Sequence, residues 1–168
     1  NNKIKKIDLE NKKIIDENNT SYNYDKILFA NGASPKKINS KGIKGVYYLR
    51  DIKDSLKVQS KISISENIIL LGAGYINLEI ASTIRENFPN KKISIIEFSS
   101  NVLGRNSNDD IRKIINNNNL DNNIKFYFNS SIKEMIGHPN IEKIILNNQI
   151  EVLCDMIVVG IGVTPNID

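Results

Sequence analysis

Two glycines that follow an apolar run are the residues of this chain whose spacing first suggests chemistry. The run "NIILL" ends at Leu71, and the segment "GAGYINLE" follows it. At a strand-to-helix turn, glycine lets the backbone reverse at Gly72 and approach an anion closely at Gly74. The first free N–H groups of the helix then point at the anion, assisted by the helix dipole. The pattern predicts a dinucleotide-binding turn made of Gly72, Ala73, Gly74, Tyr75 and Ile76.

The third glycine of the usual G-x-G-x-x-G pattern is replaced by Asn77. That glycine allows close packing of the helix on the strand, so its replacement need not abolish phosphate binding. The helix face that Asn77 shares with Ile80, Ala81 and Ile84 is expected to be buried, and a buried amide needs hydrogen-bond partners. A strand-to-helix turn whose glycines serve packing alone remains the alternative.

An acidic residue at the end of the next predicted strand bears on which dinucleotide binds. The carboxylate of Glu97 can accept hydrogen bonds from the adenosine ribose hydroxyls, and it disfavours a 2′-phosphate. This position favours NAD over NADP. Arg105 lies in the following loop and could serve a 2′-phosphate, so NADP remains an alternative.

Alternating elements are expected to position this turn. Strands are predicted at 67–71, 92–98 and 124–128, and a helix from about Tyr75 to Phe88 separates the first two. A second helix is predicted after a capping box formed by Ser107 and Asp110. This β-α-β-α-β series favours a parallel sheet with right-handed crossovers. The apolar stripe of the first helix is predicted to consist of Ile76, Ile80, Ile84 and Phe88.

The flanking segments are predicted to be mostly β structure. The segments "KIKKIDL" and "KKIID" suit a hairpin, and an apolar strand is expected from Ile27 to Ala30, before a turn that Pro35 closes. A helix capped by Asp51 or Ser55 is predicted before the glycine turn. After residue 128, the short runs "SIKEMI", "IEKIIL" and "IEVL" indicate a small antiparallel meander, which a buried strand in "DMIVVGIG" follows.

Composition excludes several other classes of function. The net charge is +4, but the lysines are scattered, which argues against nucleic-acid binding. The chain contains no run of about 20 apolar residues, which is the length that a membrane span needs. The N-terminus has no signal-peptide core, so nothing marks the protein for secretion. The compartment is left open, and the expectation is an intracellular protein, in the cytoplasm or an organelle. It also lacks an initiator Met, so we expect the numbering to begin inside a longer protein. Cys154 is expected to be a buried structural thiol, and the lone His138 is not expected to bind a metal.

Three separated motifs resemble those of the FAD-dependent pyridine nucleotide-disulfide oxidoreductases. They are "YDKILFANGASP" (24–35), "IILLGAGYINLEIA" (68–81) and "CDMIVVGIGVTPN" (154–166). The second is similar to the family's G-x-G-Y-I-x-x-E motif, in which the sixth position is often Gly but can be Ala, so Asn77 is a departure. Within the family, "GVYYLRDIKDSLKV" resembles the branch of ferredoxin, rubredoxin and monodehydroascorbate reductases and apoptosis-inducing-factor-like proteins.

The resemblance implies an α/β fold, with a Rossmann-like NAD(P)-binding domain flanked by β segments of an FAD domain. Residues 1–46 would be the last part of the first FAD-domain segment, 47–160 the NAD(P)-binding domain, and 161–168 the return into the FAD domain. The Gly-rich FAD turn and the second FAD motif are missing from this chain. Any redox-active Cys pair would lie upstream.

The resemblance also implies roles for single residues around the two cofactors. Gly72 and Gly74 would face the NADH pyrophosphate, and Glu97 the adenosine ribose. Tyr75 and Glu79 would lie near the nicotinamide, which the strand end at Gly160 and Gly162 would approach. The residues expected near FAD in the full-length protein are Ala30, Asn31 and Gly32.

The implied activity is hydride transfer from NADH to FAD and onward to an unknown acceptor. NADPH is a less favoured cofactor, the full-length protein is a possible homodimer, and the chain alone is expected to be inactive. The alternatives are a redox-sensing interaction protein of the apoptosis-inducing-factor type and a stand-alone NAD-sensing domain without flavin.

Overall fold

The structure, a computed structural model, describes residues 2–104, 110, 113 and 124–167. The chain divides into two compact units, Asn1–Gly32 with Ile167–Asp168, and Ala33–Asn166. Arg105 and most of the helix predicted after Ser107 lie outside the described residues, which include only Asp110 and Lys113 of that segment. The domain ranges expected from the sequence were defined by which cofactor each segment would bind, not by how compactly the chain folds. They remain predictions.

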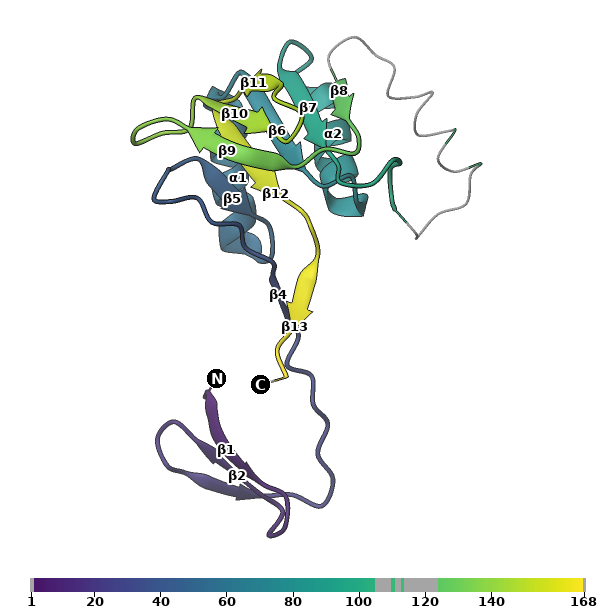
Figure 1. Ribbon diagram of the computed structural model, residues 1–168. Helices are drawn as coiled ribbons and strands as arrows, with labels where there is room; N and C mark the ends of the chain where they lie inside the picture. The colour runs from purple at the N-terminus through teal and green to yellow at the C-terminus, as the bar shows by residue number, and fades with distance from the viewer. Residues whose placement is uncertain (1, 105–109, 111–112, 114–123, 168) are drawn as a thin grey trace. The chain divides into compact units, whose positions relative to one another are not determined.

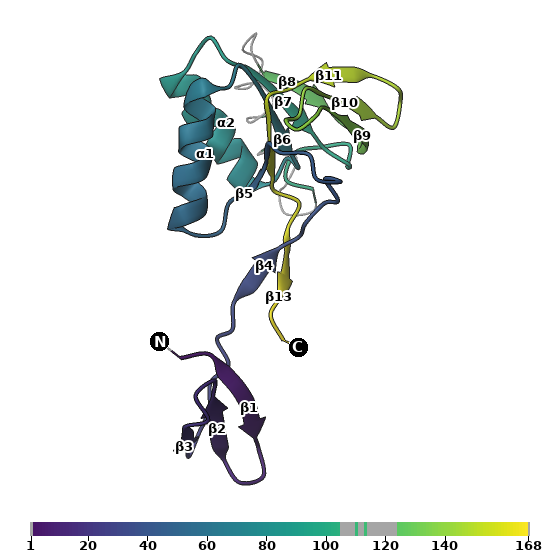
Figure 2. The same ribbon diagram turned by 90° about the vertical axis from the view of Figure 1, so that its left-hand side faces the viewer.

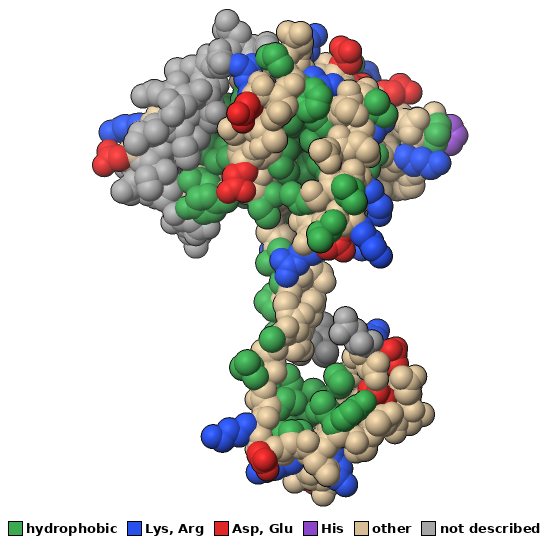
Figure 3. Space-filling view, turned by 180° about the vertical axis from the view of Figure 1, so that it is seen from behind, with side chains coloured by type: hydrophobic (Ala, Val, Ile, Leu, Met, Phe, Trp, Pro, Cys, Tyr) green, Lys and Arg blue, Asp and Glu red, His purple; other side chains and the backbone are tan. Residues whose placement is uncertain are grey.

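The first unit is a small antiparallel sheet. Its strands β1 (Ile4–Asp8), β2 (Lys13–Asp16) and β3 (Ser21–Asn23) pair in the order β1-β2-β3. The predicted hairpin is thereby confirmed, and β3 is an addition that the sequence pattern did not indicate. The register sets the side chains of Ile7, Ile14 and Tyr22 opposite one another, and Figure 3 shows hydrophobic side chains gathered on a face of this unit.

Asp16 anchors the turn that joins β2 to β3. It is fully buried, and its carboxylate accepts hydrogen bonds from Asn2, Asn18, Thr20 and Tyr22. Desolvation raises the pKa of this carboxyl, but the hydrogen bonds outweigh it and hold the pKa below its ordinary value. The ionised form of Asp16 therefore stabilises this unit.

The second unit is built on a parallel sheet, as predicted. The strand order is β5-β12-β6-β7-β8, and each neighbouring pair is parallel (Figure 1). The central strands are continuous apolar runs, which suits a sheet covered on both faces. The strands are β5 (Val46–Tyr48), β6 (Asn67–Leu71), β7 (Lys92–Ile96), β8 (Ile124–Tyr127) and β12 (Met156–Val159).

Two helices cover one face of this sheet. Helix α1 (Ile52–Ile64) is preceded by its N-cap Asp51, one of the two predicted caps, whose carboxylate accepts from the N–H of Asp54 at 2.9 Å. Helix α2 (Tyr75–Asn87) ends just before Pro89, in agreement with the prediction. The helices and the sheet face beneath them share one hydrophobic core, which includes Val58, Ile62, Ile68, Leu70, Ala81, Ile84, Ile93, Ile95, Met156 and Val158.

An antiparallel meander covers the opposite face, so that the unit has three layers (Figure 2). Strands β9 (Ile132–Ile136), β10 (Lys143–Leu146) and β11 (Glu151–Leu153) are those predicted after residue 128. A second core lies between the meander and the sheet, and it includes Ile69, Ile96, Ile144, Leu146, Val152, Cys154 and Ile157.

Three details differ from the sequence expectations. No strand forms at Ile27–Ala30, because a strand requires a pairing partner and no described residue supplies one; Leu28 is 89% exposed. Ile76 is 46% exposed and does not belong to the buried stripe of α2, which consists of Asn77, Ala81 and Ile84. Strands β4 (Ala33–Pro35) and β13 (Val163–Pro165) pair antiparallel, and this pair was not predicted.

Candidate functional site

A cleft of about 990 Å³ lies in the second unit, where the parallel strands end. Its walls include the residues that follow β6, β7 and β12, together with β9 and the loop at 38–43. From β6 the chain proceeds through β7 to β8 on one side, while β12 lies on the other side of β6. A reversal of strand order of this kind opens a crevice at the carboxyl ends of the strands, which is the usual ligand site of such sheets.

The two glycines of the turn are there for different reasons. Gly72 has φ +97°, and a Cβ on it would lie 2.6 Å from the carbonyl oxygen of Gly160, so the fold itself requires glycine there. Gly74 has φ −82°, and the nearest described atom to a Cβ on it would be 3.9 Å away. The fold does not demand glycine at 74, but a ligand that approaches the backbone from the cleft would.

The N-terminus of α2 opens on this cleft. Gly74 is its N-cap and supplies no side-chain hydrogen bond, and the first turn of the helix contains no acidic residue. The positive end of the helix dipole is therefore not neutralised by a side chain of its own first turn, which favours an anion there. Tyr75 and Ile76, which line the cleft, are 56% and 46% exposed.

Glu97 follows β7 directly, and its side chain connects the glycine turn after β6 with the turn after β7. Its Oε2 accepts a hydrogen bond from the backbone N–H of Ala73 at 2.7 Å. Its Oε1 accepts from both the N–H and the hydroxyl of Ser99 at 2.7 Å. The carboxylate is thus fixed beside the glycine turn while it lines the cleft. The role of Ser99 was missed from the sequence, although a serine two residues after a strand-end acid is a usable signal for such a bond.

Asn77 is fully buried, as its helix face predicted, and its amide finds partners in the turn. Its Nδ2 donates to the carbonyl oxygens of Leu71 and Gly72, both at 2.8 Å. Its Oδ1 has no hydrogen-bond partner among the residues that the structure describes. A Cβ on Gly160 would lie 2.7 Å from the Asn77 amide, so Gly160 leaves the space that this side chain fills.

The remaining candidate residues fall into two groups. Gly160 and Gly162 line the cleft, and Gly162 has φ +101°. Glu79 is exposed on α2 and is not among the residues that line the cleft. The three residues expected near FAD belong to the first unit and do not line the cleft either; they are Ala30, Asn31 and Gly32.

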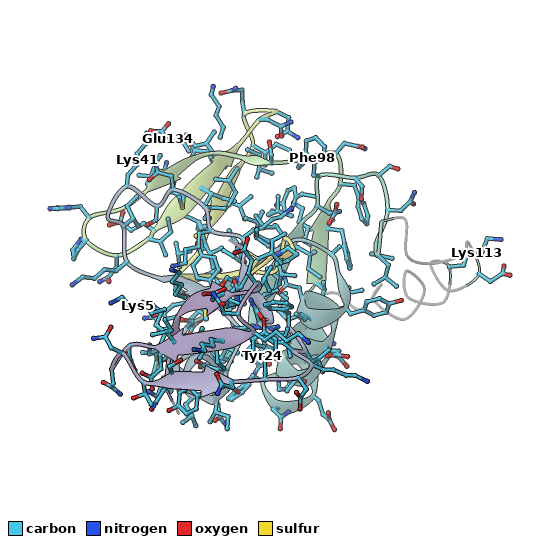
Figure 4. The ribbon with its side chains drawn as sticks, turned by 90° about the horizontal axis from the view of Figure 1, so that it is seen from below. Lys5, Tyr24, Lys41, Phe98, Lys113 and Glu134 are labelled. Carbon is cyan, nitrogen blue, oxygen red and sulfur yellow. The ribbon has the colours of Figure 1, made fainter. Side chains whose placement is uncertain are left out.

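Several cleft residues were not singled out from the sequence. Phe98 is 82% exposed at the cleft, and Lys41, Lys133 and Glu134 also line it. Figure 4 shows Phe98 well separated from Lys41 and Glu134, so these two charged residues do not lie beside the aromatic ring. The sequence signal that could have indicated Phe98 is an aromatic residue directly after the Glu at the end of the strand.

The other polar candidates are consistent with structural roles. Cys154 is buried, and burial together with the neighbouring Asp155 raises the pKa of its thiol to about 12. The predicted burial of this thiol is confirmed. His138 is exposed, and the described residues contain no group of three or more His, Cys, Asp or Glu side chains that could hold a metal ion. No helix within the described ranges is long and apolar enough to cross a membrane.

Comparison with known proteins places this geometry in context. A family model described as pyridine nucleotide-disulphide oxidoreductase matches residues 1–168. The rubredoxin-NAD(+) reductase of Ectopseudomonas oleovorans is 30% identical over 173 residues, which cover 100% of this chain and 44% of that protein. Apoptosis-inducing factor 3 of Homo sapiens is 26% identical over 162 residues, which cover 95% of this chain and 26% of that protein.

A solved structure shows the same fold. The ferredoxin reductase for the CYP199A2 system from Rhodopseudomonas palustris superposes with a TM-score of 0.91 at 23% identity. The match covers 99% of this chain and 41% of that one. The chain therefore spans less than half the length of each of these three proteins.

Proposed function

The chain belongs to the pyridine nucleotide-disulphide oxidoreductase family, and on that premise we propose that it contributes the NADH-binding part of an FAD-dependent oxidoreductase. The observation that carries this proposal is the glycine turn. The backbone at Gly74 is open to the cleft although the fold does not require glycine there. A bound dinucleotide explains that opening, because its pyrophosphate must approach the backbone closely.

The residues of the cleft fit NADH along its length. The pyrophosphate would lie over Gly74 and the N-terminus of α2, and the ribose hydroxyls would donate to Glu97. The adenine would stack on Phe98, whose ring is exposed at the cleft. The nicotinamide end would then extend toward Gly160 and Gly162. The cleft volume of about 990 Å³ is at the upper end of the range of ligand pockets, which suits a dinucleotide.

The fixed carboxylate supports NADH over NADPH. Hydrogen bonds from Ala73 and Ser99 hold Glu97 in place, so it cannot turn away from a 2′-phosphate. Two unit charges about 4 Å apart at an effective dielectric constant of about 20 repel by about 4 kcal/mol. NADPH would meet this repulsion, and the ribose of NADH would instead gain hydrogen bonds.

FAD, when bound to the full-length protein, would supply the hydride acceptor and pass electrons onward. This chain's own part is to bind and orient the dinucleotide. We propose that Ala30, Asn31 and Gly32 lie against FAD in the full-length protein. Ile7 and Tyr22 form a hydrophobic face and are 37% and 43% exposed, which supports packing of this unit against more protein in the full-length chain.

The names of the relatives favour a small electron-carrier protein as the acceptor, since one of them is a rubredoxin reductase and another a ferredoxin reductase. Steady-state reduction of rubredoxin, ferredoxin and a chemical acceptor by the full-length protein with NADH tests this choice. Turnover with the chemical acceptor but with neither carrier protein would refute this choice.

Light scattering tests the proposed homodimer, and imaging of a tagged protein tests the proposed intracellular location.

Calorimetry with NADH and NADPH tests the proposed function itself. We expect the full-length protein to bind NADH more tightly than NADPH, and this chain alone to bind NADH weakly without turnover. Absence of NADH binding by both forms would overturn the proposal.

A redox-sensing interaction protein is the second candidate, and the similarity to apoptosis-inducing factor 3 favours it. In that case NADH binding would change association while turnover stays slow. Steady-state NADH oxidation by the full-length protein, measured beside its sedimentation with and without NADH, separates the two functions. The segment at 27–35 speaks against a stand-alone NAD-sensing domain, which would have no need of it.

A further inference from the structure

One peptide group of the glycine turn is held at both of its ends by side chains. The carbonyl oxygen of the Gly72–Ala73 peptide accepts from the Nδ2 of Asn77 at 2.8 Å. The N–H of the same peptide donates to the Oε2 of Glu97 at 2.7 Å. The two side chains come from different elements, α2 and the end of β7. Together they fix the orientation of the peptide group that leads into Gly74.

We propose that Asn77 is a positioning residue of the dinucleotide site, which fixes the turn in the conformation that binds the pyrophosphate. The proposal rests on the proposed function, because it assigns a role within that site. Asn77 does not reach the cleft: it is fully buried and is not among the cleft-lining residues. It acts through the backbone of the turn.

The same side chain also connects the turn to the end of β12. The three nearest atoms to a Cβ on Gly160 would all belong to the Asn77 amide, at 2.7 to 2.8 Å. Gly72 in turn packs against the carbonyl oxygen of Gly160. Asn77 therefore fills the space between the two strand ends that flank the cleft. A substitution at position 77 therefore changes which side chains fit at position 160, and a substitution at position 160 does the same for position 77.

Stability alone does not account for an asparagine at this position. Its Oδ1 is buried without a partner among the described residues, and an unpaired buried acceptor destabilises a fold. Glycine, the usual residue of the dinucleotide-binding pattern, would remove that acceptor. It would also remove both bonds from Nδ2 and free the turn. A turn that contains two glycines loses more conformational freedom on binding than a turn already held, so holding it favours affinity.

Asn77→Gly, which restores the usual pattern, is therefore expected to weaken NADH binding. In the full-length protein we expect the Kd for NADH to rise by about fivefold or more, which is the effect of losing about one hydrogen bond. KM for NADH should rise while kcat at saturating NADH stays unchanged, because Asn77 touches no reacting group. Asn77→Ala is the second variant, should the glycine variant fail to fold.

Asn87→Ala is the matched control. The Nδ2 of Asn87 donates to the carbonyl oxygen of Thr83 at 2.8 Å, which is the same kind of bond on the same helix. Asn87 lies at the other end of α2 and does not line the cleft. Its loss should leave the NADH affinity unchanged. Equal affinities of wild type, Asn77→Gly and Asn77→Ala would overturn the proposal.

Two further measurements separate this proposal from the proposed function. Exchange of the Ala73 amide hydrogen needs no ligand, and it should become faster in the Asn77→Gly variant than in wild type. Gly160→Ala should lower the thermal midpoint strongly in wild type but only slightly in the Asn77→Gly background. Failure of wild type to bind NADH contradicts the proposed function; unchanged Ala73 exchange together with additive midpoints contradicts the positioning role.

Discussion

Alanine at the two glycines of the turn should separate a residue needed for the fold from one needed for the ligand. At Gly72 an added Cβ would lie 2.6 Å from a backbone carbonyl oxygen, at φ +97°. The positive φ alone costs a residue other than glycine about 1–3 kcal/mol, and the backbone clash adds to it. We expect Gly72→Ala to lower the free energy of unfolding by more than about 2 kcal/mol.

Gly74→Ala should behave in the opposite way. Its φ of −82° is allowed for alanine, and its Cβ would lie 3.9 Å from the nearest described atom. A reduced entropy of the unfolded chain stabilises by about 0.4–1 kcal/mol, while alanine is a poorer N-cap than glycine by a similar amount. The free energy of unfolding should therefore change by less than about 0.5 kcal/mol. The new methyl group would occupy the place that we propose for the pyrophosphate, so the Kd for NADH should rise by about tenfold or more.

Urea denaturation gives the two stabilities, and calorimetry gives the two affinities. A matched control is Gly42→Ala, where φ is +81° but a Cβ would meet no described atom within 4 Å, and Gly42 is not among the cleft-lining residues. We expect it to show the cost of a positive φ without a backbone clash, at an unchanged affinity for NADH. The reasoning is refuted if Gly74→Ala binds NADH like wild type. It is also refuted if Gly74→Ala destabilises the protein as much as Gly72→Ala.

Three further substitutions test other parts of the account. Glu97→Gln should weaken NADH binding and reduce the ratio of the NADPH Kd to the NADH Kd. Titration of each nucleotide into this variant and into Glu134→Gln, a control at another acidic residue of the cleft, checks this. Phe98→Ala should raise the Kd for NADH by about fivefold or more at an unchanged thermal midpoint, because the ring is 82% exposed; an unchanged Kd would exclude stacking. The stabilisation by Asp16, whose pKa is lowered on folding, is complete above about pH 4 and is lost as the pH falls through the folded pKa. Asp16→Asn should therefore flatten the acid limb of a thermal-midpoint curve, and an unaltered limb would contradict this role.

The elements with strong local patterns could be predicted from the sequence, and those that depend on a distant partner could not. Strand β6 and helices α1 and α2 are marked by apolar runs, a capping carboxylate and a terminating proline. Strands β4 and β13 have three residues each and exist because they pair with one another. The segment Ile27–Ala30 is the converse, since it carries a strand pattern without a described partner.

The same distinction holds for the site. The types and spacing of Gly72, Gly74 and Glu97 indicate a dinucleotide before any coordinates are known. The bond from Ala73 to Glu97 and the contact between Asn77 and Gly160 depend on how β6, β7 and β12 are arranged side by side. No sequence spacing specifies them, because they join positions that only the folded sheet brings together.

The most direct test of the account is hydrogen exchange of the full-length protein with and without NADH. We expect NADH to slow amide exchange in segments 72–78 and 97–104, which surround the proposed pyrophosphate and adenosine positions. Helix α1 and the sheet β1–β3 should exchange at unchanged rates. Protection confined to other segments, with 72–78 unaffected at saturating NADH, would contradict the claim that this glycine turn binds the dinucleotide.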